Sequence, residues 1–157
     1  MPADLSFLEM AVDLAKENVL SGHGGPFGAV VVKHGCVIAA GTNMVTSTND
    51  PTAHAEIVAI RRACEALQSF QLDGCEIYSS CEPCPMCLGA IYWARPNAVY
   101  YANTREDAAS AGFDDAFIYE QVMVPPEQRV LTMRYVWHEK AREHFELWQK
   151  SHTNIRY

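Results

Sequence analysis

The chain has 157 residues, of which 49% are hydrophobic and 20% are charged, the composition of an ordinary globular protein. This length predicts a single domain over residues 1–157. Uncharged apolar stretches such as Pro83–Ala94 are much shorter than the roughly 20 residues of a membrane-spanning helix. The formal net charge of −7 argues against a nucleic-acid partner, because such binding depends on Lys and Arg at phosphates.

The N-terminus carries Asp4 and Glu9 and no basic segment before them, which does not fit a secretory signal. Six cysteines are too few for a disulfide scaffold of this size. Together these features predict a reducing cytoplasmic compartment, where clustered cysteines bind metals or catalyse reactions. We expect no membrane partner.

The first third of the chain predicts one helix and a hairpin. A helix is expected over residues 6–19, because apolar residues recur on one helical stripe after the capping-box pattern Ser6-x-x-Glu9. The glycine-rich residues 21–26 end it. Two buried strands follow at Ala29–Lys33 and Cys36–Ala40, joined by a turn at 34–35.

Helices and strands alternate through the middle of the chain. Asp50-Pro51 predicts the N-cap and first residue of a helix that reaches Leu67. A short strand is expected at Glu76–Ser80, a helix at Met86–Ala94 and another strand at Ala98–Tyr101. This alternation favours an α/β fold with helices on both faces of one sheet.

The last third predicts a broken helix, a strand, a helix and a tail. Asp107–Tyr119 has helical character interrupted at Gly112. Residues 131–137 alternate apolar and polar side chains, which predicts a strand with one buried face. Lys140–Lys150 reads as a helix, and residues 151–157 form a polar tail.

Two short motifs, each at an expected helix start, carry the chemistry. One is His54-Ala55-Glu56, and the other is Pro83-Cys84-Pro85-Met86-Cys87. Zinc prefers imidazole nitrogen and thiolate sulfur, so His54, Cys84 and Cys87 form a candidate Zn²⁺ site. The unpaired N–H groups at a helix N-terminus favour the thiolate that a metal requires.

Glu56 is the candidate catalytic residue beside this site. It lies two positions from His54, about 200° around an ideal helix, so it is poorly placed to be another ligand on the same face. Three protein ligands leave a fourth zinc position for water. A carboxylate beside that water can take its proton and pass it to a substrate.

Other readings of the cysteines stay open. Cys81, Cys84 and Cys87 with His54 would make a closed four-ligand site, as in a structural zinc module without catalysis. The cysteine triplet also matches part of an iron–sulfur run. Against a closed site, Pro83 should break the helical phase between Cys81 and Cys84, and the four ligands would leave Glu56 without a role.

The combined spacing resembles the His-x-Glu and Pro-Cys-x-x-Cys signature of zinc-dependent base deaminases. Over nearly its whole length the chain is similar to the bacterial guanine deaminases of the cytidine-deaminase-like superfamily. The similarity runs through Gly24–Val30, Asn49–Glu56, Ser80–Pro96 and Gly112–Asp115. The resemblance implies a three-layer α/β/α sandwich with a five-stranded mixed sheet. It also implies zinc-dependent hydrolysis of guanine to xanthine and ammonia in purine catabolism or salvage.

The resemblance further implies roles for individual residues. Glu56 would activate water and relay protons, and Phe27 would stack on the purine ring. Asn43 would form a hydrogen bond with the purine. Asp115 would act in catalysis and binding by receiving the amino group of the substrate, as a carboxylate that accepts N–H groups can.

The resemblance also implies a role for the C-terminal tail. Tyr157 resembles a C-terminal tyrosine that closes the pocket, with residues 151–157 exchanged between subunits in a domain-swapped homodimer.

The main enzymatic alternative is a tRNA adenosine-editing deaminase, which shares both motifs. That enzyme would need a basic groove and an open pocket for a flipped base, and the net charge of −7 speaks against it.

Overall fold

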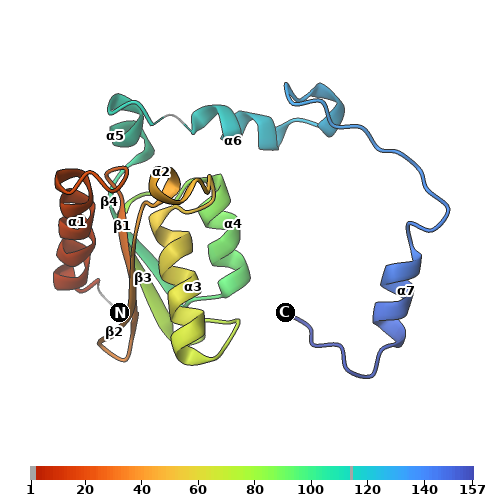
Figure 1. The fold of residues 1–157 in the computed structure, drawn as a ribbon, viewed down its shortest axis with the longest axis horizontal. Coiled ribbons are helices and arrows are strands. Elements are labelled where there is room, and N and C mark those ends of the chain that lie inside the picture. Colours follow the sequence, from red (N-terminus) through yellow and green to blue (C-terminus); the bar gives the residue numbers. More distant parts are fainter. Residues whose placement is uncertain (1–2, 114) are drawn as a thin grey trace. The chain divides into compact units, whose positions relative to one another are not determined.

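A computed structural model describes residues 3–113 and 115–157 of the chain. The chain divides into two compact units, the first ending at Ala116 and the second running from Phe117 to Tyr157. Each unit is described by itself below (Figure 1). Asp114, one of the residues of the resemblance, lies outside the described residues.

A mixed four-stranded sheet forms the centre of the first unit (Figure 1). Its strands lie in the order β2 (Cys36–Thr42), β1 (Gly28–Lys33), β3 (Cys75–Cys81) and β4 (Ala98–Asn103). The pairs β1–β2 and β1–β3 are antiparallel, whereas β3–β4 is parallel. The parallel pair is connected through a helix, as such a crossover requires.

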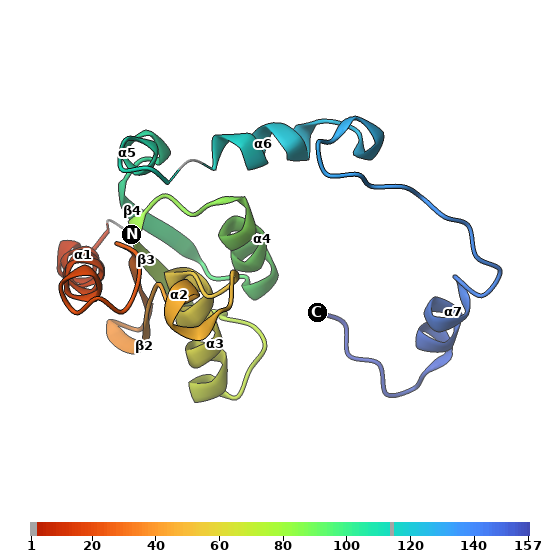
Figure 2. The ribbon, with the colours of Figure 1, turned by 45° about the horizontal axis from the view of Figure 1, so that its top comes forward.

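Helices cover both faces of this sheet and make three layers (Figures 1 and 2). Helix α1 (Leu5–Leu20) packs on one face, over a cluster that includes Val30, Val32 and Tyr78. Helices α3 (Ala55–Leu67) and α4 (Pro85–Ala94) pack on the other face. The short helix α2 (Val45–Thr48) precedes α3. The α/β/α arrangement expected for the family is therefore present.

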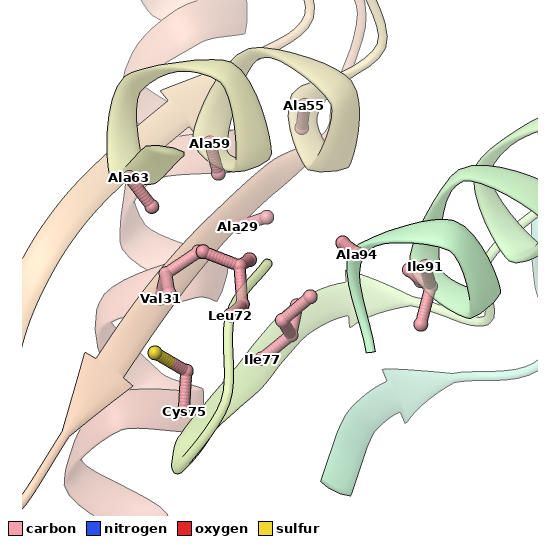
Figure 3. Close-up of a cluster of buried hydrophobic side chains, with 10 residues drawn as sticks. All are labelled: Ala29, Val31, Ala55, Ala59, Ala63, Leu72, Cys75, Ile77, Ile91 and Ala94. Carbon is pink, nitrogen blue, oxygen red and sulfur yellow. The ribbon is translucent and has the colours of Figure 1, made fainter. Parts of the chain in front are cut away.

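Small residues bring α1 and α3 close to the sheet. The buried alanines of α3 point toward the strands in Figure 3: Ala55, Ala59 and Ala63. A Cβ at Gly41 would lie 2.3 Å from Ala55 O, and one at Gly28 would lie 2.3 Å from Ala11 O. These contacts leave no room for a side chain, so both strand glycines are needed for the close approach of the helices.

Two predicted helix starts are wrong. Helix α1 begins at Leu5 and is capped by Asp4, whose carboxylate accepts a hydrogen bond from Ser6 N at 2.9 Å, in place of the expected capping box. Asp50 Oδ1 accepts from Thr52 N at 2.8 Å and stabilises a turn, while α3 starts only at Ala55. In both places an aspartate took the nearest available N–H groups, and this local competition is not visible in hydrophobic spacing.

After β4 the chain forms α5 (Arg105–Ser110), α6 (Ala116–Met123), the 3₁₀ turn η1 (Pro126–Gln128) and α7 (Glu143–Lys150). The interruption predicted at Gly112 is confirmed. This residue has φ +91°, a conformation that favours glycine and ends a helix. Among the described residues no helix combines the length and apolar character needed to cross a bilayer.

The predicted strand at residues 131–137 does not form, so among the described residues the sheet has four strands and not five. Tyr135 and Trp137 are 86% and 71% exposed, and Val136 between them is exposed too. Alternation predicts which face a strand would bury, but a strand forms only where a neighbour accepts its hydrogen bonds. Within the described part of the second unit no partner strand is present.

Candidate metal centre and active-site pocket

His54, Cys84 and Cys87 come together as a cluster with the donor atoms of a metal site. Their ligand atoms all lie within 4.8 Å of one another. The Sγ atoms of Cys84 and Cys87 each lie 3.5 Å from His54 Nδ1. One imidazole nitrogen and two sulfurs from elements far apart in the sequence are a donor set that zinc prefers.

The ends of two helices position these ligands. His54 is the N-cap of α3 in an extended conformation, and its side chain forms no capping bond to the helix. Cys84 is the N-cap of α4, followed by Pro85 at the first helical position. Cys87 lies one turn further along α4, and side chains at these two positions meet at the start of a helix. Both motifs lie at helix starts as predicted, although α3 is capped by His54 and does not begin at Asp50.

The protonation of the cluster suits a cation. A hydrogen bond from the Cys87 thiol, together with His54, holds the pKa of Cys84 at about 4, so Cys84 is a thiolate at neutral pH. The same bond and burial raise the pKa of the Cys87 thiol, which holds the shared proton. A metal ion that displaced this proton would meet two thiolates and an imidazole, so the residues present fit Zn²⁺.

Glu56 lies in the first turn of α3, buried next to the cluster. Its Oε2 accepts from the Cys87 thiol at 3.5 Å, and its Oε1 accepts from Ser79 Oγ at 3.3 Å. Burial raises the pKa of the Glu56 carboxyl, which brings it toward the range in which a group can both take and return a proton. Ser79 had no signal in the sequence, since a serine inside a strand is unremarkable there.

Cys81 is not part of the ligand cluster. Its thiol donates to Thr104 O at 3.5 Å, and burial raises its pKa to about 11. Cys81 ends β3, whereas Cys84 begins α4, so Pro83 separates the two elements as the sequence indicated. The arrangement does not match a closed site with four protein ligands.

A cavity of about 630 Å³ opens beside the cluster in the first unit. It brings together five of the residues singled out in the sequence: Phe27, Asn43, His54, Glu56 and Asp115. Cys84 lines it as well, while Cys87 is fully buried. Tyr157 belongs to the second unit, where its side chain is exposed.

Two aromatic rings form part of the cavity wall. Phe27 and Phe113 meet edge to face, with ring centroids 4.9 Å apart, a favourable arrangement for aromatic pairs. Phe113 was noticed only as part of the Gly-Phe-Asp-Asp stretch, without a role of its own. Burial raises the pKa of the nearby Asp115 carboxyl, which also lines the cavity.

An ion pair in the cavity lining was not predicted from the sequence. Glu82, two residues before Cys84, accepts three hydrogen bonds from Arg105: from Nη2 at 2.5 Å, from Nε at 3.1 Å and from the backbone N at 3.1 Å. The pair joins the ligand-bearing loop to α5, which leads on to Phe113 and Asp115. The two residues are 23 positions apart, so no local pattern could reveal them.

Comparisons with known proteins agree with this site. The family model for the cytidine and deoxycytidylate deaminase zinc-binding region matches residues 1–103. The guanine deaminase of Bacillus subtilis (strain 168) is 57% identical over 144 residues, which cover 92% of this chain and 92% of that protein. An X-ray structure of guanine deaminase from Bacillus subtilis matches with a TM-score of 0.97 and 53% identity, covering 99% of each chain.

Similarity to tRNA-editing enzymes covers less of the chain. A tRNA-specific adenosine deaminase of Aquifex aeolicus (strain VF5) is 42% identical over 96 residues, which cover 61% of this chain and 63% of that protein. The match to guanine deaminase therefore covers much more of the chain. The chain belongs to the cytidine and deoxycytidylate deaminase family of zinc enzymes and, within it, to the guanine deaminases.

Proposed function

We propose that this protein hydrolyses guanine to xanthine and ammonia, with Zn²⁺ held by His54, Cys84 and Cys87. The observation that carries the proposal is the position of Glu56. This buried carboxylate contacts a cysteine of the ligand cluster and also lines the cavity. A structural zinc module has no need for such a group, whereas a hydrolase needs a proton carrier there.

Proton transfer is the work of Glu56. Zinc in such a site supplies Lewis acidity and lowers the pKa of water toward about 7. Glu56, with its pKa raised by burial, takes a proton from the attacking water and delivers it to a ring nitrogen of guanine. A second proton passes through Glu56 to the departing amine, so the products are xanthine and neutral ammonia and the carboxylate is restored.

The cavity lining supplies recognition of a flat purine. Phe27, supported by Phe113, offers an aromatic face for stacking. Asn43 offers an amide for a hydrogen bond to the ring, and Asp115 accepts N–H groups of the reacting amine. Asp115 lies within the same cavity as Glu56, so one bound base can reach both carboxylates.

We also propose that the active protein is a homodimer in which residues 151–157 are exchanged between subunits and Tyr157 closes the partner's pocket. Large apolar side chains are exposed in both units, among them Tyr92 at 76% on α4 and Trp137 on the second unit. Exposed apolar area of this extent usually marks an interaction surface. We also propose a cytoplasmic location for the reaction, where the ligand cysteines stay reduced.

Ammonia release by zinc-loaded protein tests the activity. Guanine, guanosine, adenine, cytosine and cytidine should be compared at equal concentration, and a tRNA anticodon arm should be assayed for inosine. Turnover of guanine well above the others is expected. Turnover of another substrate without turnover of guanine would overturn the proposal, and inosine formation alone would favour the tRNA-editing alternative.

A further inference from the structure

Asn18 is a buried polar residue near the C-terminal end of α1, only 5% exposed. Its Nδ2 group donates two hydrogen bonds, to Gly25 O at 2.8 Å and to Asn43 O at 2.9 Å. The two acceptors lie on different loops, one entering β1 and the other leaving β2. A single amide group therefore ties two separate segments of the cavity wall to one helix.

Both segments carry residues of the proposed base-binding site. Gly25 O also accepts from Phe27 N at 2.9 Å, and Asn43 N donates to Phe27 O at 3.1 Å. Gly24 packs directly on the Asn43 carbonyl that Asn18 holds, because a Cβ at Gly24 would lie 2.1 Å from Asn43 O. The backbone positions of Phe27 and Asn43 thus depend on the two carbonyl groups that Asn18 holds.

The orientation of the Asn43 side chain follows from the same arrangement. Its Oδ1 accepts from Gly25 N at 3.4 Å and from Val45 N at 3.3 Å. With its oxygen directed at the backbone, Asn43 has its NH₂ group to present as a donor to a ligand in the cavity that it lines. Displacement of Gly25 would remove one of the bonds that set this orientation.

We propose that Asn18 is a positioning residue for base binding, which holds Phe27 and Asn43 in place without touching the substrate. This inference rests on the proposed function. A side-chain amide suits this task, because its NH₂ group offers two N–H donors, one for Gly25 O and one for Asn43 O. An alanine would leave Asn43 O without its Asn18 donor and Gly25 O with Phe27 N alone, and a buried carbonyl that loses its donor destabilises the local structure.

The loss should appear mainly in substrate affinity. Asn18 contacts neither the ligand cluster nor Glu56 in the described structure, so metal binding and proton transfer should persist once guanine is bound. We expect Asn18→Ala to raise KM at least tenfold and to lower kcat by less than threefold, since the disturbed contacts act on binding. Zinc content should stay at the wild-type level.

A double-mutant cycle separates positioning from general stability. Asn18→Ala, Asn43→Ala and the double variant are compared for kcat and KM on folded, zinc-loaded protein. If Asn18 acts through Asn43, the double variant should lose much less than the product of the single losses. Asn97→Ala is the matched control. Asn97 Oδ1 accepts from Gly74 N at 3.1 Å, away from the cavity lining, and its loss should leave KM unchanged.

The outcomes divide cleanly. Multiplied losses in the double variant, or a KM for Asn18→Ala within twofold of wild type, would overturn the positioning role. If the wild-type protein does not convert guanine, the proposed function fails, but the geometry can still be tested. In ¹H–¹⁵N spectra, Asn18→Ala should then shift the backbone amide signals of Phe27 and Asn43 far more than Asn97→Ala does. Unchanged signals would show that Asn18 does not hold Phe27 and Asn43 in place.

Discussion

Glu56 Oε2 lies 3.5 Å from the Sγ atom of Cys87, which places a buried carboxylate directly against the predicted metal ligands. The contact joins α3 to α4 although the two residues are 31 positions apart in the chain. It makes the carboxylate available both to the metal centre and to a base in the cavity. The catalytic proposal depends on this pair.

Replacing Glu56 with Gln should separate metal binding from catalysis. The amide keeps the size of the side chain and an oxygen that can accept from Ser79, but it cannot carry a proton between water and substrate. We expect a loss of about 10²–10⁴ in kcat with zinc content unchanged. Metal analysis and steady-state kinetics on the same preparation measure both, and an active Gln variant would remove Glu56 from its role.

The three ligands should be distinguishable from Cys81. His54→Ala, Cys84→Ala and Cys87→Ala each remove a donor atom of the cluster and should lower zinc content after dialysis against a weak chelator. Cys81→Ala is the matched control, because Cys81 lies outside the cluster. Zinc loss in the Cys81 variant as well as in the other three would instead favour a closed four-ligand site.

The pair between Glu82 and Arg105 should matter for activity as well as stability. Arg105→Ala removes two of the three hydrogen bonds to Glu82 and loosens the segment that carries Asp115. We expect kcat/KM to fall roughly tenfold, as positioning losses of about 1.4 kcal/mol do. Arg61→Ala, which breaks the exposed pair with Asp50, should have no effect on kcat/KM. Equal losses in both variants would contradict a positioning role.

The same pair predicts a pH dependence of stability. Arg105 holds the pKa of Glu82 below its ordinary value of 4.5. A lowered folded-state pKa contributes stability that is fully present above 4.5 and disappears as the pH falls through the lower value. The difference in Tm between wild type and Arg105→Ala should therefore narrow below pH 4.5. A difference that stays constant down to pH 3 would show that the charge on Glu82 contributes nothing.

Exchange of residues 151–157 can be tested by complementation. Glu56→Gln and a variant lacking residues 151–157 should each be nearly inactive as homodimers. Co-expressed with different affinity tags and purified as heterodimers, they should regain about half of the wild-type activity, because one intact pocket meets one intact tail. Heterodimers as inactive as the parents would indicate that each tail serves its own subunit or has no role.

The motifs could be predicted because their chemistry is local. Cys84 and Cys87 share one helix start, and a proline marks its position, so spacing alone predicted neighbouring thiols. His54 joined them because imidazole and thiolate together suit zinc. Roles that depend on partners distant in the sequence could not be predicted. Asn18 acts through Asn43, and Arg105 acts through Glu82. In each pair, neither residue carries a sequence pattern that indicates the other.

The wrong prediction of a fifth strand also arose because a distant partner decides the structure. Residues 131–137 have the alternation of a strand, yet whether they pair depends on a neighbouring edge and not on their own sequence. The start of α3 was wrongly predicted at Asp50, because an aspartate can cap a turn as readily as a helix. Here too a hydrogen-bond partner decided the structure, but a partner close in the sequence. Side-chain periodicity predicted the layers of the fold, and hydrogen-bond partners decided the details.

Formation of xanthine from guanine is the most direct test of the proposed function. Purified protein should be stripped of metal with a chelator, assayed, reloaded with Zn²⁺ and assayed again, with xanthine and ammonia both quantified. We predict no turnover without metal, and after reloading xanthine and ammonia in equal amounts. Reloaded protein with full zinc content at His54, Cys84 and Cys87 that forms no xanthine would contradict the account.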